Sequence, residues 1–111
     1  MLEIAKHAAA TSKYNAAVTS SIHSSINALD TLAVFYFGHR HSGSHEGAVN
    51  AVKGALTEKE FDDVSKQFSG LMSLKNQVEY QPDLMLARDA NDAVKRASRI
   101  VSKVKEKLPD E

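Results

Sequence analysis

The spacing of hydrophobic and polar residues along the chain predicts an all-α protein. Apolar side chains recur at steps of three and four over most of the 111 residues, which is the spacing of one face of an α-helix. Short alternating runs typical of strands are absent, and the chain has only five glycines and two prolines. The length suits one domain, so we expect a single helical domain over residues 1–108 and a frayed C-terminus at 109–111.

The first part of the chain predicts a short helix, a break and then the longest helix. The short helix is expected from about Leu2 to Ala10, with Thr11-Ser12 as a break or a cap. The long helix is expected over residues 14–37, where one stripe comprises Tyr14, Val18, Ile22, Ser25, Leu29, Leu32 and Tyr36. Small residues in its first half allow close packing, either at the centre of a bundle or across a dimer axis. A helix that is only weakly hydrophobic at that end would have the same composition.

The second part of the chain contains clearer boundaries. Residues 38–44 end the long helix, and Ser44 is expected to cap a helix that carries Ala48, Val49, Val52 and Leu56. Thr57 and Glu60 have the spacing of a capping box, just before a stripe of Phe61, Val64, Phe68, Leu71 and Val78. Pro82 breaks this pattern after residue 80. A last helix is expected over residues 88–108, with a narrow seam of Ala90, Val94, Ala97, Val101, Val104 and Leu108.

Composition limits the classes of function. Fourteen basic and fourteen acidic residues give zero formal charge, so the chain as a whole has no general attraction to nucleic acid or membrane. The absence of cysteine excludes disulfides, thiolate metal sites and a cysteine nucleophile. No secretory signal is evident, and no apolar stretch approaches the ~20 residues of a membrane span. A cytoplasmic protein without a membrane anchor is the expectation.

Histidine and arginine are concentrated in the turn at residues 39–45. His39, Arg40, His41 and His45 lie within seven residues. Imidazole has an unperturbed pKa of ~6.5 and exchanges protons near neutrality, and guanidinium holds phosphate in a planar fork. We interpret Arg40 and His45 as candidate catalytic residues for phosphodiester chemistry, with His41 in support. A turn that only caps a helix is the alternative.

Asp30 is the second supporting candidate. His23, Asn27 and Asp30 follow one another at steps of four and three, so they project from one face of the long helix. Asp30 could hold an imidazole of the turn in one tautomer or raise its basicity. The three residues could equally be polar groups satisfied by neighbours or exposed to solvent.

Several other kinds of site are disfavoured. The three histidines of the turn offer nitrogen ligands, but no HExxH or acidic companion pattern accompanies them, so we predict neither a metal nor another cofactor. No nucleophile elbow and no glycine-rich phosphate loop is present. The last helix is basic and could follow phosphates. Its acids near the start and bases toward the end are also what the helix dipole favours, and that explanation is the stronger one.

The order of these segments resembles the small single-domain HEPN (higher eukaryotes and prokaryotes nucleotide-binding) domains. The resemblance spans about residues 14–104 and rests on the small-residue helix, the turn with glycine and histidine, and two later segments. The later segments are Leu71-Met72-Ser73-Leu74-Lys75-Asn76-Gln77-Val78-Glu79-Tyr80 and Asp89-Ala90-Asn91-Asp92-Ala93-Val94. The resemblance implies a four- to five-helix up-and-down bundle, commonly a homodimer, that is associated with RNA or nucleotides.

Many HEPN proteins are toxin ribonucleases whose partner is a nucleotidyltransferase-like antitoxin. Their signature is an arginine followed after four to six residues by a histidine, late in the bundle. Here Lys75 stands where the arginine is expected, and no histidine follows His45. The resemblance therefore implies Lys75, Asn76 and Tyr80 as candidate nucleotide-binding residues without the usual catalytic pair.

The Arg-x4-His spacing occurs once, at Arg40 and His45 in the earlier turn. If two subunits of a dimer brought their turns together, Arg40 could bind a phosphate of RNA while His45 moved a proton, without a metal. A chance match among clustered histidines is the alternative. We therefore predict an RNA- or nucleotide-binding domain, with metal-independent ribonuclease activity of a toxin–antitoxin module as its extension. The alternative is a noncatalytic homodimeric or partner-binding helical module.

Overall fold

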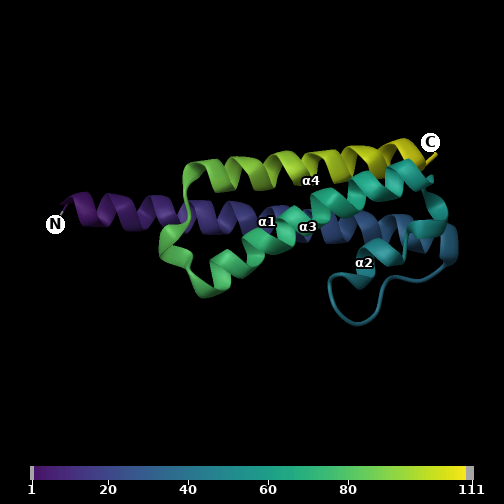
Figure 1. The fold of residues 1–111 in the computed structure, drawn as a ribbon, viewed down its shortest axis with the longest axis horizontal. Coiled ribbons are helices and arrows are strands. Elements are labelled where there is room, and N and C mark those ends of the chain that lie inside the picture. Colours follow the sequence, from purple (N-terminus) through teal and green to yellow (C-terminus); the bar gives the residue numbers. More distant parts are fainter. Residues whose placement is uncertain (1, 110–111) are drawn as a thin grey trace.

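The chain folds into an all-α bundle, as predicted. The structure is a computed structural model that describes residues 2–109, with the side chains of residues 10–109. Its four α-helices are α1 (Leu2–Phe37), α2 (Gly47–Asn50), α3 (Glu58–Tyr80) and α4 (Ala87–Lys107), and no strand occurs among residues 2–109. Short 3-10 turns follow α2 at Lys53–Ala55 and α3 at Pro82–Leu84. Figure 1 shows α3 running antiparallel to both α1 and α4. Of the predicted frayed end, residues 110–111 lie outside the described residues.

The predicted break at Thr11-Ser12 is wrong, because α1 is one continuous helix of 36 residues. Threonine and serine cost only a fraction of a kcal/mol per residue in a helix, and neither glycine nor proline interrupts this stretch. Thr11 is also buried, so packing against the bundle favours the helical conformation there. The N-terminal part of α1 extends past the other helices (Figure 1).

α1 is the central helix and contacts every other element of the bundle. The predicted stripe on α1 is buried from Val18 to Leu32, whereas Tyr14 is half-buried and Tyr36 is exposed. Buried Ser25 satisfies its hydroxyl by donating to the carbonyl of Ser21 at 2.9 Å. The largest fully buried side chains of the core are Leu29, Leu32, Leu71, Met85 and Ile100.

The boundaries of α3 are where the sequence predicts them. Thr57 caps the helix: its hydroxyl accepts from the Glu60 amide at 3.2 Å, and the Glu60 carboxylate accepts from the Thr57 amide at 2.9 Å. The same carboxylate forms ion pairs with Lys103 and Lys107 of α4. Hydrogen bonds from Lys107 and from Thr57 hold the pKa of Glu60 at about 2. α3 ends at Tyr80, ahead of Pro82, which begins a 3-10 turn.

The apolar seam of α4 matches the predicted one in part. Its buried residues are Ala90, Ala93, Ala97, Ile100 and Val104, so Ala90, Ala97 and Val104 are buried as predicted. Val94, predicted to be in the seam, is 50% exposed, and Val101 is half-buried. Both line an open groove between α4 and the small residues of α1. Their places in the core are taken by Ala93 and Ile100, each one residue earlier and therefore ~100° away around the helix.

Ser44 does not cap the helix that follows the turn. The residue before α2 is Glu46, which makes no side-chain capping bond, and the first amides of α2 bond to the carbonyls of Ser44 and His45. The predicted helix is also shorter than expected, since regular α-helix ends at Asn50. Burial of Ala48, Val49 and Val52 nevertheless anchors this segment to the core.

Candidate functional site

The turn between α1 and α2, residues 38–46, carries three of the four candidate catalytic residues, Arg40, His41 and His45. Gly38 and Gly43 have φ angles of 80° and 88°, a left-handed conformation that other residues rarely adopt. These two glycines let the chain reverse at the end of α1 and reverse again before α2. We call residues 38–46 the histidine turn.

Asp30 of α1 binds the middle of the histidine turn. His41 Nδ1 lies 2.6 Å from Asp30 Oδ1, and the His41 amide donates to the same oxygen at 3.4 Å. The Arg40 guanidinium donates to Asp30 Oδ2 at 3.3 Å. An ionised carboxylate only accepts hydrogen bonds, so Nδ1 of His41 carries a proton.

The pKa of Asp30 is lowered by these contacts. Burial alone raises it, since the residue is only 6% exposed, but hydrogen bonds from His41 and Arg40 and the charge of His41 outweigh this effect. The pKa therefore lies below the ordinary value of 3.8, and Asp30 is ionised at neutral pH. The sequence predicted Asp30 as a partner for an imidazole of the turn, and in the structure that imidazole belongs to His41.

His45, at the other end of the turn, faces α3. A cavity of about 190 Å³ is lined by Thr19, Ile22 and His23 of α1, by His45, and by Lys75, Val78 and Glu79 of α3. A second cavity of about 310 Å³ is lined by Gly43, Ser44, His45, Glu46, Met72, Lys75 and Asn76. His45 and Lys75 line both cavities, so we treat the two as one site, the His45–Lys75 site.

The His45–Lys75 site contains acidic as well as basic groups. Lys75 Nζ pairs with Glu79 Oε1 at 2.7 Å, and this hydrogen bond raises the pKa of Lys75. Glu46 lines the larger cavity with Lys75, and the pKa of its carboxyl is lowered by a hydrogen bond from its own backbone and by one from Ser44. The site therefore contains two carboxylates, those of Glu46 and Glu79, and one lysine.

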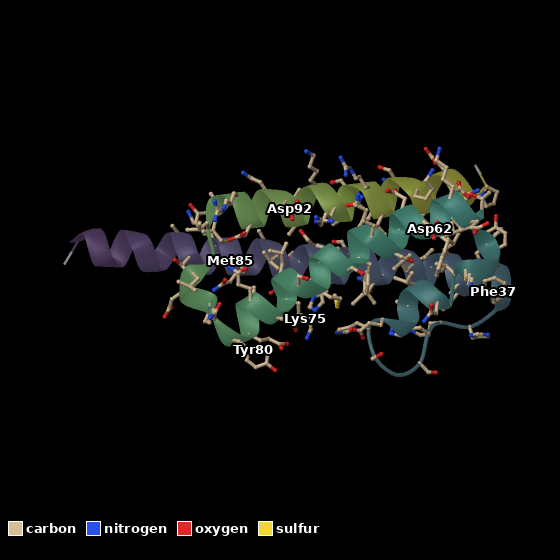
Figure 2. The ribbon with its side chains drawn as sticks, viewed as in Figure 1. Phe37, Asp62, Lys75, Tyr80, Met85 and Asp92 are labelled. Atoms are coloured by element: carbon tan, nitrogen blue, oxygen red, sulfur yellow. The ribbon has the colours of Figure 1, made fainter. Side chains whose placement is uncertain are left out.

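The predicted candidates are distributed over different parts of the surface. Arg40 lines a separate groove of about 410 Å³ with Asn27, Asp30, Thr31 and Val34, so within one chain it shares no described cavity with His45. Tyr80 is 79% exposed and is directed away from the bundle at the end of α3 (Figure 2). The structure thus brings Lys75 and Asn76 together with His45, and leaves Arg40 and Tyr80 outside that site.

Several lining residues were not identified from the sequence. The row of His23, Asn27 and Asp30 is divided between sites, since only His23 reaches the His45–Lys75 site. Thr19, Ile22, Val78 and Glu79 were missed as site residues. The spacing of Lys75 and Glu79 by four residues was an available signal for a pair on one helix face.

Three of the seven basic residues of α4 form ion pairs with acids. Arg96 pairs with Asp92, Lys103 with Glu60 and Glu106, and Lys107 with Glu60. Lys95 and Arg99 line a wide open groove, together with Asp63 and Glu106. This mixture of charges favours the interpretation of α4 as a solvated face.

The described residues also limit other kinds of site. In the part of the chain that the structure describes, no three histidine, aspartate or glutamate side chains are grouped so as to hold a metal ion. No helix within residues 2–109 is both long and apolar enough to cross a membrane. Comparisons with protein-family models, curated proteins and solved structures find no match to this chain. The resemblance to HEPN domains stays a prediction from the sequence.

Proposed function

We propose that the chain binds RNA by holding one nucleotide in the His45–Lys75 site. The observation that carries this proposal is that His45 and Lys75, which lie 30 residues apart in the sequence, line the same two cavities. Together the cavities have the size typical of small-ligand sites, roughly 300–1,000 Å³. A cytoplasmic location belongs to the same proposal.

The lining groups match the parts of a nucleotide. Ile22 and Val78 provide apolar surface in the smaller cavity, next to the imidazoles of His23 and His45. A base can stack on imidazole, and single-stranded RNA presents unstacked bases. Lys75, Asn76 and Ser44 supply donors to a phosphate in the larger cavity. Glu46 and Glu79 oppose an anion, so a phosphate must compete with Glu79 for Lys75.

Ribonuclease activity would extend this proposal with Lys75 in place of Arg40. His45 would accept the proton of a ribose 2′-hydroxyl while that oxygen attacks the adjacent phosphorus. The bond to the 5′ oxygen then breaks, the leaving oxygen takes up a proton, and a 2′,3′-cyclic phosphate remains. Lys75 would stabilise the charge of the phosphorane, and no metal is needed because RNA contains its own nucleophile.

The test is binding and cleavage of single-stranded RNA by the purified chain in EDTA. We expect binding to weaken at least fivefold in His45→Ala and in Lys75→Ala. His39→Ala should bind like the wild type, because His39 is an exposed histidine of the same turn that lines neither cavity. Cleavage with 2′,3′-cyclic ends that is lost in both site variants would establish the enzyme. RNA that is neither bound nor cut would overturn the proposal.

A noncatalytic homodimeric or partner-binding module is the second candidate, and an exposed apolar patch favours it. Val34, Phe35, Tyr36 and Phe37 at the end of α1 are each 42–54% exposed. Adjacent exposed apolar side chains of this size often mark a protein interface. A dimer seen by light scattering that dissociates in Phe35→Ser would support this candidate. The nucleotidyltransferase-like antitoxin implied by the HEPN resemblance is one partner to test on the same patch.

A further inference from the structure

The middle of the histidine turn, residues 39–43, is hydrogen-bonded to the bundle through one side chain. Within the described residues, every hydrogen bond that joins residues 39–43 to a helix ends on the carboxylate of Asp30. The remaining bonds of the turn are local, such as the one from the Gly38 amide to the carbonyl of Val34. Without Asp30, residues 39–43 would lose their hydrogen bonds to α1, and only the bond of Gly38 at the start of the turn would remain.

Asp30 is itself held rigidly. It lies on α1 between Leu29 and Leu32, both of which are fully buried, and its own side chain is only 9% exposed. The ring of His41 is 13% exposed, so the short bond between the two side chains is largely shielded from water. A charge-assisted bond of this length in a shielded position is among the stronger hydrogen bonds of proteins.

The anchored residue lies close to the site residue. His41 precedes His45 by four positions, and the flexible φ of Gly43 lies between them. After His45 in the sequence, burial of Ala48 and Val49 holds α2 against the core. His45 is therefore fixed from both sides, by Asp30 through His41 and by α2. Because the turn is otherwise exposed, the anchor at His41 determines how much freedom His45 has.

We infer that Asp30 is a positioning residue for the His45–Lys75 site: its contacts with His41 and Arg40 fix the histidine turn so that His45 faces Lys75. This inference rests on the proposed function for the importance of His45, but the anchoring itself does not. It also gives Arg40 a role that needs no contact with RNA. Arg40 balances the charge of a buried carboxylate and adds a third hydrogen bond between Asp30 and the turn.

The experiment measures the order of the turn and the binding of RNA separately. Amide hydrogen exchange of residues 39–46 and the ring NMR signals of His45 report the turn, and anisotropy of a labelled single-stranded RNA reports binding. The variants are Asp30→Asn, which keeps the shape but removes the charge, and His41→Ala, which removes the partner. Asp62→Asn is the matched control, because it removes one charge from an exposed position on α3.

We expect exchange of the residue 41 amide, which donates to Asp30, to accelerate about tenfold or more in both anchor variants, with a shift of the His45 signals and roughly tenfold weaker RNA binding. Protection of the Leu71 amide in the core should stay high, which shows that the bundle remains folded. Unchanged exchange in both variants would overturn the inference, and so would a released turn with unchanged RNA affinity. A wild type that binds no RNA overturns the proposed function instead, and the exchange data then still decide whether Asp30 anchors the turn.

Discussion

Glu79 makes the proposed phosphate site testable by a gain of affinity. Its carboxylate lies 2.7 Å from Lys75 Nζ, so any phosphate that approaches this lysine meets a negative charge and must compete for the same donor. Glu79→Gln removes the charge and keeps the size of the side chain. The variant should therefore bind RNA more tightly than the wild type.

The expected gain follows from the geometry of the pair. A phosphate bound by Lys75 would lie about 5 Å from the Glu79 carboxylate, and Coulomb's law at the dielectric constant of water gives a roughly fourfold effect at that distance. The side chains of Lys75 and Glu79 are 31% and 47% exposed, so a water-like dielectric is appropriate. The release of Lys75 adds to the effect, and we expect three- to tenfold tighter binding at low salt. At about 1 M salt the Debye length is ~3 Å and most of the gain should disappear.

The assay is fluorescence anisotropy with a labelled single-stranded RNA at low and high salt. Glu106→Gln is the matched control, because Glu106 pairs with Lys103 at 2.7 Å but lies on α4, away from His45. If Glu79→Gln binds no more tightly than the wild type, Lys75 does not hold the phosphate. An equal gain in Glu106→Gln would show a general effect of charge rather than a site.

Three predictions concern the stability of the bundle. Thr57→Ala removes the capping bond to Glu60 and should lower the free energy of unfolding by about 1 kcal/mol in urea titrations, and no loss would contradict the importance of the capping box. Leu29→Ala leaves a cavity at a fully buried position and should cost about 2–5 kcal/mol, whereas less than 1 kcal/mol would mean that α1 is not central. The pKa of Glu60 is about 2 in the folded protein, whereas its ordinary value is 4.5. Its contribution to the free energy of unfolding is therefore present above pH 4.5 and is lost as pH falls toward 2. Glu60→Gln should flatten thermal stability in that window, and an unchanged slope would contradict the ion pair with Lys107.

The parts of the fold that were predictable from the sequence are set by local chemistry. The capping box at Thr57 and the proline after Tyr80 act within a few residues, and the structure has the ends of α3 there. The all-α class was predictable for the same reason, because helical periodicity is also a pattern among residues three or four positions apart. The break in α1 and the position of Val94 depend instead on which neighbour covers each face. Thr11 remains helical because it is buried, and Val94 is exposed because Ala93 and Ile100 face the core.

The candidate site was also predictable only where local sequence determines it. The sequence indicates that the histidine turn, Lys75 and Asn76 carry suitable side chains, but their meeting depends on how α3 packs against α1. The spacing of Arg40 and His45 suggests one site along the chain. In the fold, however, Asp30 draws Arg40 toward α1, while His45 lies against α3. Short-range spacing within a turn does not determine on which side of the turn each residue lies.

The most direct test of the account is the affinity of the wild type, His45→Ala and His39→Ala for one single-stranded RNA. We expect measurable binding by the wild type that is at least fivefold weaker in His45→Ala and unchanged in His39→Ala. Equal affinities of all three proteins, or no binding by the wild type, would contradict the assignment of the His45–Lys75 site to RNA.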